Sequence, residues 1–437
     1  MIISTLKYIY YKLPPNLRVL VRNVYYSINP NKIHVSPDHF PVNYKKNIDL
    51  PIFGRSEKEG YFYRYYQEKA VILNLSPEDL FKYKYEIIYG TYYKNEQLKF
   101  QCKEDSVLPI SMESHKDMLR ITRDDKLTDE IKNLPTKRYQ YFTAKKGIRY
   151  SIESNNGIII GKPIQLQQKI KHKKKLVLCI FIDGLADLSG LGRYEDDLLM
   201  PHTTSFFKNG TRFRNNFSNA EWTLPSVPSF FTGTRQQSHG FFSPKDNHVI
   251  GKDSKILSEI FQEDGYLTYQ ACGNWRKSPA YGYVKGFDRT VYKKEMDAKE
   301  IIFSFLEHMR AFKDRDNFVW LTLMDVHHLL KAIPDVSNSI IDKIMVTPWH
   351  DPDNKNKSLF TSVDENLVDI YVNEIKRLDY YLNIIYDYLN ANFEEDLNIK
   401  YMKVSGDFNI SNMKVAYNID SKYTKINGKS FNKDLID

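Results

Sequence analysis

Four continuous apolar runs constrain the fold of this chain most strongly. They occupy residues 176–182, 267–272, 318–324 and, less cleanly, 399–404. Runs without alternation of apolar and polar residues are typical of strands buried on both faces of a parallel sheet. Helical patterns lie between the runs, and the clearest covers 363–389, with Ser362 and Glu365 as a capping box at its start. Strands that alternate with helices predict an α/β fold built from right-handed crossovers.

Polar residues follow each apolar run. The sequences at these positions are Asp-Gly at 183–184, Gly-Asn-Trp-Arg at 273–276, Asp-Val-His-His at 325–328 and Ser-Gly-Asp at 405–407. In open α/β sheets, functional residues gather just past the carboxyl ends of the strands. A single aspartate there would more often belong to a turn or a helix cap. Four polar strand ends in one sheet favour a common site for a metal ion or an anion.

The first part of the chain has a different texture. Short runs rich in Val, Ile, Tyr and Phe cover 70–75, 83–93, 98–102, 139–143 and 157–164. Such runs predict a small β-rich domain. The sequence therefore divides into a basic segment at 1–50, a β-rich accessory domain at 51–170 and an α/β domain at 171–437.

The charge is concentrated near the start of the chain. The formal net charge is +9, but 54 acidic residues are interspersed with 63 basic ones, which favours a mixed-charge surface over a nucleic-acid groove. Residues 1–50 carry seven Lys or Arg against two Asp. This basic, aromatic segment could lie on an anionic membrane surface or pack on its own protein. The sequence contains no apolar run long enough to span a membrane and no recognisable signal peptide. It therefore predicts a cytoplasmic protein, which could also contact the inner membrane surface peripherally.

The segment 219–233 reads NAEWTLPSVPSFFTG. With the strand ends around it, residues 176–408 resemble the branch of the alkaline phosphatase superfamily that contains sulfatases and phosphoglycerol or phosphoethanolamine transferases. The matching motifs are IDG at 182–184, TLPS and TG at 223–226 and 232–233, GNWR for the family's GKWH at 273–276, LMDVH at 323–327, the helix pattern Y-x-x-E-I-x-x-L-D at 371–379 and SGD at 405–407.

This resemblance implies a fold and a site. The fold would be a three-layer α/β/α domain with a mostly parallel sheet, preceded by the small β-rich domain. Asp183, Thr223 and Asp407 would hold a divalent cation, which could be Mn, Mg, Ca or Zn, and Thr223 would be the nucleophile. The expected substrate is an anionic glycan or a lipid headgroup.

The chemistry of the residues supports that assignment. A threonine hydroxyl has too high a pKa to attack an ester at neutral pH unless a cation lowers it. Carboxylates from separate strand ends suit a hard cation, and a helix N-terminus favours an anionic substrate. Pro225 falls in the first turn after Thr223, where a missing N–H costs nothing. The alternative is that Thr223 is a plain N-cap.

The details favour a phosphate ester over a sulfate ester. Classical sulfatases oxidise Cys or Ser to formylglycine and have an arginine four residues later, whereas this chain has Thr223 and Val227. Asn274 replaces the family's lysine, although Arg276 can contact an anion bidentately. His327 is the main candidate for contacting the substrate or leaving group, and His328 a lesser one, although a lone strand-end histidine is usually structural.

The chain also departs from the family. Phe408 stands where a histidine is expected after Asp407, and the sequence ends at Asp437, short of the family's usual length. These departures leave a second interpretation open. The chain could be a catalytically impaired relative that binds an anionic ligand or acts as a scaffold.

Overall fold

The computed structural model describes residues 59–66, 83–166, 175–185, 196–212, 218–327, 365–393 and 399–406, without 95, 115–117, 125, 133–136, 221, 245–247 and 252–254. It also describes residues 14, 17, 21, 40, 415–417, 425–426 and 429–430. The strand predicted at 70–75, the capping box at Ser362 and nearly all of the basic segment at 1–50 lie outside these residues.

Five parallel strands form the centre of the α/β region, in the order β14-β13-β15-β11-β16. Their bounds are β11 Leu176–Asp183, β13 Leu267–Cys272, β14 Arg289–Tyr292, β15 Asn317–Leu323 and β16 Ile399–Gly406. Four of them are the apolar runs of the sequence, and the short β14 was not predicted. The register pairs Asp183 of β11 with Gly406 of β16, so two of the predicted polar strand ends lie side by side at one rim.

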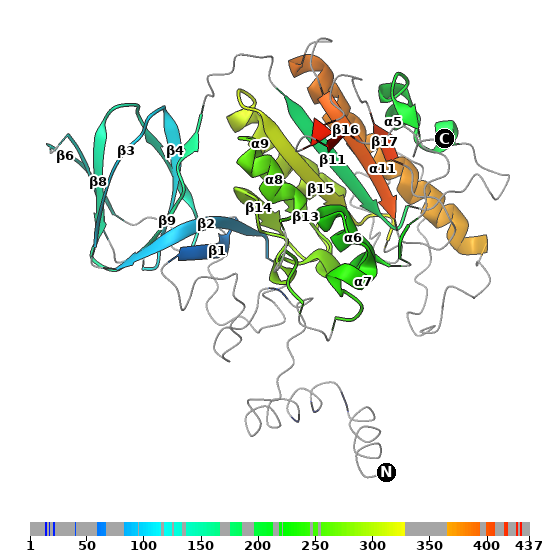
Figure 1. The fold of residues 1–437 in the computed structure, drawn as a ribbon, viewed down its shortest axis with the longest axis horizontal. Helices are drawn as coiled ribbons and strands as arrows, with labels where there is room; N and C mark the ends of the chain where they lie inside the picture. Colours follow the sequence, from blue (N-terminus) through cyan, green and yellow to red (C-terminus); the bar gives the residue numbers. More distant parts are fainter. Residues whose placement is uncertain are drawn as a thin grey trace.

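Helices cover both faces of this sheet (Figure 1). Leu178 and Ile180 of β11 pack into a core cluster with α9 (Ala298–Phe312) and α11 (Glu365–Asn392). Cys179 and Phe181 face the opposite cluster, which contains α6 (Thr223–Thr232) and α8 (Leu257–Glu263). Because successive strand residues point to opposite faces and both faces are buried, every position of the run must be apolar. The predicted three-layer α/β/α class is confirmed.

A buried aspartate joins two helices on the α9 and α11 face. Asp379 of α11 is 1% exposed and accepts hydrogen bonds from the backbone N–H groups of His202 at 2.8 Å and Thr203 at 2.9 Å. These groups belong to the first turn of α5 (Pro201–Phe206), where helical N–H groups have no partner within the helix. The aspartate of the predicted Y-x-x-E-I-x-x-L-D helix pattern therefore caps another helix.

The other helices in the described ranges are short. They are α4 (Asp196–Leu199), α7 (Gln236–His239) and the 3₁₀ turns η5 (Trp275–Lys277) and η6 (Pro279–Tyr281). Among the helices that the structure describes, none combines the length and the apolar character needed to cross a membrane.

The β-rich region is built from antiparallel strands. They are β1 Glu59–Tyr65, β2 Tyr85–Lys94, β3 Gln97–Gln101, β4 Ser106–Met112, β5 Met118–Arg123, β6 Lys126–Lys132, β7 Gln140–Ala144, β8 Arg149–Ser154, β9 Gly157–Gly161 and β10 Ile164–Gln165. A separate sheet in the order β3-β8-β5-β6 packs against β4 and β9 through a shared apolar cluster. The predicted β-rich region is confirmed, but β1, β4, β5, β6 and β8 were not foreseen.

The β-rich region and the α/β region share one sheet. Strand β2 pairs antiparallel with β14, so the central sheet continues into β9, β4 and β10, and β1 pairs with β2. At the far edge, β17 (Val415–Tyr417) and β12 (Thr211–Arg212) extend the sheet beyond β16, and β18 (Lys425–Ile426) pairs with β19 (Lys429–Ser430). The predicted boundary near residue 170 stays a prediction.

A buried ion pair crosses this junction. The Arg289 guanidinium of β14 contacts the Glu86 carboxylate of β2, and their side chains are 5% and 4% exposed. The Tyr141 hydroxyl donates a further hydrogen bond to Glu86. A buried charge is tolerated only when it is paired, so each side chain depends on the other.

Glu86→Ala should therefore destabilise the protein strongly. We expect a loss of about 3–5 kcal/mol in the free energy of unfolding, because Arg289 would remain charged, buried and unpaired. Glu130→Ala is the control, since Glu130 pairs with Arg120 at 3.1 Å on the surface and should cost below about 1 kcal/mol. Urea unfolding followed by tryptophan fluorescence measures both, and equal losses would contradict the role of the junction pair.

Candidate active site

Asp183 forms the centre of the candidate site. It is the last residue of β11 and its side chain is fully buried. The chain turns sharply at Gly184, whose φ of +78° suits glycine. A Cβ at Gly184 would meet the Cα of His327 at 3.0 Å, so this glycine also allows the loop after β15 to approach. The Tyr371 hydroxyl of α11 donates to the Gly184 carbonyl at 2.6 Å.

The Thr223 hydroxyl contacts the Asp183 carboxylate. Thr223 is the first residue of α6, and its Oγ1 donates to Asp183 with distances of 3.1 Å to Oδ2 and 3.3 Å to Oδ1. The N-cap residue of α6 is Trp222, which makes no side-chain cap. Thr223 is therefore not the plain N-cap that the sequence left as an alternative.

Asn274 approaches the same carboxylate from the neighbouring strand. It follows β13, and its Nδ2 donates to Asp183 Oδ2. Its Oδ1 accepts the backbone N–H of Arg276 at 2.7 Å, which fixes the side chain at the start of η5. The residue predicted to bind substrate is thus placed directly on Asp183.

His327 also lies near Asp183, but at a longer distance than Thr223 and Asn274. Its Nε2 is 4.0 Å from Asp183 Oδ2, and its side chain is 21% exposed. The ring meets Trp275 edge to face, with centroids 5.8 Å apart. His328 and Asp407 lie outside the residues that the structure describes, although Gly406, next to Asp407 in the chain, pairs in register with Asp183.

After β15, it is His327 and not Asp325 that lies beside Asp183 in the candidate site. Asp325 follows β15 closely but forms an ion pair with Arg377 of α11 at 2.8 Å, and Glu374 pairs with the same guanidinium. Asp325 also accepts the backbone N–H of Ala298 at the start of α9. The strand-end carboxylates therefore have different tasks: Asp325 is neutralised by arginine, whereas Asp183 faces neutral donors.

Burial controls the protonation of the site. It raises the pKa of Asp183 to about 7, although hydrogen bonds from Thr223, Asn274 and the Gly184 N–H act in the opposite direction. Burial, together with the positive charge of Arg276, lowers the pKa of His327 to about 4. The imidazole is therefore neutral at pH 7 and can offer a nitrogen lone pair or an N–H group.

These side chains fit a divalent cation. A buried carboxylate without a cationic partner among the described residues is costly, and a metal ion would compensate it. Carboxylate and hydroxyl oxygens with a neutral imidazole are suitable ligands for a hard or borderline divalent ion. In the described part of the chain, however, no group of three His, Cys, Asp or Glu side chains is placed to hold a metal. A further ligand would have to come from elsewhere, and Asp407 is the predicted one.

Two cationic side chains lie over tryptophan rings near the candidate site. The Arg276 guanidinium lies over the ring of Trp222, 5.1 Å from its centroid, and the Lys294 ammonium lies 5.5 Å from the centroid of Trp275. Together with the N-terminal end of the helix dipole, the Arg276 guanidinium favours an anionic ligand beside Thr223. The sequence did not single out the two tryptophans or Lys294. The two tryptophans could have been found from their positions, because Trp222 directly precedes Thr223 and Trp275 lies within the 273–276 motif. No sequence pattern pointed to Lys294.

A serine and histidine on α6 and α7 do not form a second nucleophilic pair. Ser229 Oγ lies 3.0 Å from His239 Nε2. His239 Nδ1 accepts the backbone N–H of Phe241 at 3.2 Å, so the neutral ring carries its proton on Nε2. A protonated nitrogen cannot take a proton from Ser229.

The chain belongs to the sulfatase family. The family model for sulfatases matches residues 175–397, just over half of the chain. No match to the chain was found among curated proteins.

Several solved structures are similar to parts of the chain. The periplasmic domain of phosphoethanolamine transferase EptC from Campylobacter jejuni is 16% identical, with a TM-score of 0.39 over 56% of this chain and 78% of that one. The EptC domain from Escherichia coli, in complex with Zn, is 15% identical, with a TM-score of 0.38 over 55% and 65%. The soluble domain of lipooligosaccharide phosphoethanolamine transferase A from Neisseria meningitidis is 14% identical, with a TM-score of 0.39 over 58% and 77%.

A buried lysine lies behind the turn that positions Asn274. Lys277 is 1% exposed, and its Nζ donates to Gln270 Oε1 at 2.7 Å. Aromatic rings surround the ammonium, with centroid distances of 4.9 Å to Phe231 and 5.4 Å to Trp320. Burial lowers the pKa of Lys277 to about 8.

Lys277 should make stability depend on alkaline pH. Between a folded pKa of about 8 and an unfolded pKa of about 10.4, the unfolded chain binds more protons, so stability rises with pH. From about pH 7 to about pH 9.5, we expect the unfolding free energy of the wild type to rise by about 2 kcal/mol relative to Lys277→Met. Lys255→Met, at an exposed lysine paired with Glu263, should show no such change. Urea titrations at several pH values measure this, and parallel curves for wild type and Lys277→Met would contradict it.

Proposed function

We propose that the protein is a metal-dependent hydrolase or transferase that acts on a phosphate ester of an anionic glycan or lipid headgroup through a covalent intermediate on Thr223. The observation that carries the proposal is the hydrogen bond of the Thr223 hydroxyl to the buried Asp183 carboxylate at the start of α6. A hydroxyl in contact with a carboxylate, at a helix N-terminus and near Arg276, can meet an anionic ester.

The residues take separate roles in this reaction. Thr223 Oγ1 gives up its proton to water and attacks phosphorus, and the ester oxygen leaves and takes up a proton. Water or an acceptor hydroxyl then attacks the phosphoryl group and loses a proton, and Thr223 Oγ1 leaves and is protonated again. Asp183 orients the hydroxyl, and Asn274 holds Asp183 in place. Arg276 binds the anionic group, and the neutral imidazole of His327 contacts the leaving oxygen. A divalent cation bound by Asp183, Thr223 and Asp407 would lower the pKa of the hydroxyl and offset charge on the phosphoryl group.

The site favours phosphate over sulfate chemistry. Thr223 cannot be oxidised to the formylglycine aldehyde of classical sulfatases. Val227, where those enzymes have arginine, is fully buried in the apolar cluster between α6 and the sheet. Without the aldehyde and that arginine, direct attack by a threonine hydroxyl is the remaining route, and it suits in-line phosphoryl transfer.

Turnover of a model phosphodiester tests the nucleophile. With added Mn²⁺ or Mg²⁺, the protein should hydrolyse bis-p-nitrophenyl phosphate and should act poorly on p-nitrophenyl sulfate. Thr223→Ala should lower kcat by at least about a thousandfold, because the attacking oxygen is removed. Thr223→Ser should retain part of the activity.

Thr232→Ala is the matched control for this experiment. Thr232 lies at the other end of α6, and its hydroxyl bonds to the Pro228 carbonyl at 2.8 Å, so its loss should leave turnover nearly unchanged. Equal activity of Thr223→Ala and wild type would exclude Thr223 as the nucleophile. Absence of turnover with any metal, with anion binding intact in Thr223→Ala, would instead favour the catalytically impaired binding protein.

Metal analysis tests the role of Asp183. Purified wild-type protein should retain a divalent metal after dialysis, whereas Asp183→Ala should lose it, because the proposed site would lack its buried carboxylate. Asp325→Asn is a matched control, since that equally buried carboxylate is paired with Arg377 and should not affect metal content. Metal retained equally by Asp183→Ala and wild type would exclude Asp183 as a ligand.

A further inference from the structure

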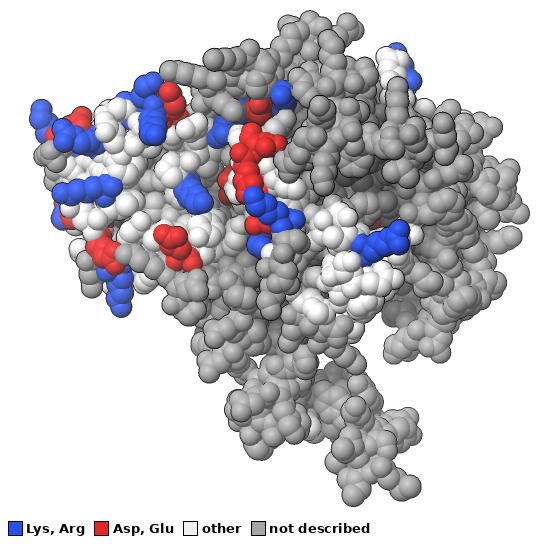
Figure 2. All heavy atoms as spheres, in the orientation of Figure 1, with Lys and Arg blue, Asp and Glu red and all other residues white. Residues whose placement is uncertain are grey.

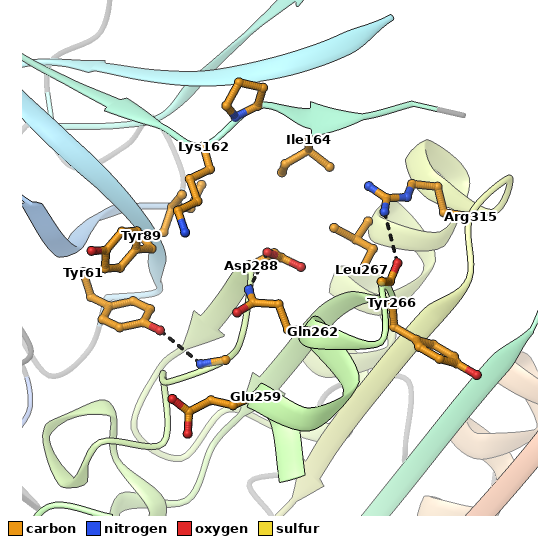
Figure 3. A pocket seen from close by; sticks show the side chains of 14 residues that line it. Tyr61, Tyr89, Lys162, Ile164, Glu259, Gln262, Tyr266, Leu267, Asp288 and Arg315 are labelled. Atoms are coloured by element: carbon orange, nitrogen blue, oxygen red, sulfur yellow. Dashed lines mark hydrogen bonds between the residues drawn. The ribbon is translucent and has the colours of Figure 1, made fainter. Parts of the chain in front are cut away.

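A cavity lies at the seam between the β-rich region and the α/β region (Figure 3). It encloses about 260 Å³. Its walls include Tyr61 of β1, Tyr89 of β2, Lys162 after β9, Gln262 of α8 and Arg315 before β15. Pockets for drug-sized ligands usually span roughly 300–1,000 Å³, so this cavity suits a smaller ligand, such as one sugar ring.

The cavity is separate from the candidate active site. Leu267 begins β13, Asp288 directly precedes β14, and Arg315 lies two residues before β15. The cavity therefore opens at the amino ends of the parallel strands, whereas Asp183 and Asn274 lie at their carboxyl ends. A strand of this length separates the two rims by about 20 Å.

The carboxylates of the cavity are already occupied. Asp288 accepts hydrogen bonds from the backbone N–H and the hydroxyl of Thr268, both at 2.9 Å, and from Gln262 Nε2 at 2.7 Å. Glu259 accepts the backbone N–H of Ile256 at 3.0 Å and lies 3.7 Å from the Lys285 ammonium. Both carboxylates already accept hydrogen bonds from within the protein, so few of their oxygen lone pairs are left to bind a ligand.

The hydrogen bonds of the cationic side chains are longer, although Asp288 and Asp316 lie close enough to Arg315 to interact with its charge. Arg315 Nε is buried and has no hydrogen-bond partner among the described residues. Its two other nitrogens reach the carbonyls of Gln165 and Gly265 only at 3.3 and 3.4 Å. The exposed Lys162 ammonium lies 4.7 Å from the centroid of the Tyr89 ring. Figure 3 shows Lys162 and Arg315 on opposite sides of the cavity. A ligand with anionic oxygens would contact the Lys162 ammonium and the terminal nitrogens of Arg315, whose present hydrogen bonds are long.

Two aromatic rings form part of the remaining wall, which also contains aliphatic side chains. Tyr61 and Tyr89 pack edge to face with centroids 5.1 Å apart. The Tyr61 hydroxyl accepts the Gly286 N–H at 3.1 Å and still has its own proton to donate. Flat rings beside polar donors suit a ligand with an apolar ring face and polar edges. An inorganic anion would use only the cations, and a neutral sugar would leave them unmatched.

We propose that this seam cavity binds an acidic sugar unit, with its carboxylate or other anionic group between Lys162 and Arg315 and its ring against Tyr61 and Tyr89. Binding there does not require Thr223, so the proposal does not depend on the proposed reaction. If the substrate is a glycan, a second contact at the opposite rim would hold the polymer on the protein.

Saturation-transfer NMR on the full chain tests the cavity. We would titrate D-glucuronate, D-glucose and acetate into the Arg276→Ala variant, which lacks the guanidinium of the opposite rim. Glucuronate should bind about tenfold more tightly than glucose, which lacks the carboxylate, because charge-assisted hydrogen bonds are strong. It should also bind more tightly than acetate, which lacks the ring.

Lys162→Ala, added to the same background, should raise the dissociation constant of glucuronate about tenfold. Lys99→Ala removes a similar exposed charge from β3 and should leave the dissociation constant of glucuronate unchanged.

Equal binding of glucuronate and acetate would overturn the assignment of the ligand as a sugar. Equal binding of glucuronate and glucose would overturn its assignment as an acid. Equal effects of the two lysine variants, or no binding at about 10 mM, would overturn the cavity as the site. Activity on the phosphodiester is read separately, so failure of either proposal is distinguishable from failure of the other.

Discussion

The burial of the Asp183 carboxylate is the constraint on which the arrangement of the site depends. A carboxylate removed from water is costly unless nearby groups compensate it. Here three neutral groups approach it: the Thr223 hydroxyl, the Asn274 amide and the Gly184 N–H. Each donor belongs to a different segment of the chain. The positions of α6, of η5 and of the glycine turn after β11 therefore all depend on the same carboxylate.

The sheet determines which helix meets that charge. Along β11, Cys179 and Phe181 point toward the cluster that contains α6, and strand alternation places Asp183 on the same face. The N-terminus of α6 then lies over the end of β11, with Thr223 in its first turn. On the other face, Asp325 and Asp379 bind to α9, α11 and α5 instead. Similar carboxylates therefore hold the scaffold on one side and form the candidate site on the other.

Backbone pairing and a buried charge pair attach the β-rich region to the α/β region. Strand β2 continues the central sheet beyond β14, and Glu86 and Arg289 secure that junction. This attachment brings Tyr61 of β1 and Tyr89 of β2 to the seam cavity at the amino ends of β13 and β14. Basic and acidic side chains are interspersed over the described part of the face in Figure 2, as the composition suggested.

The sequence by itself determined the layered core and singled out Asp183, Thr223 and Asn274, which the structure places in contact. A strand buried on both faces must be continuously apolar, so β11, β13 and β15 could be read directly, and the residues at their ends followed. It could not determine which partner each polar group would choose. Asp183 and Asp325 look alike as strand-end aspartates, yet only the packing of Arg377 beside Asp325 neutralises one of them. Lys277, Lys294 and the seam cavity were also invisible, because they arise from contacts between segments far apart in the chain. The periodicity of apolar residues, two in strands and 3.6 in helices, shows which side chains are buried. Which side chains then contact one another in the interior is decided by the tertiary structure.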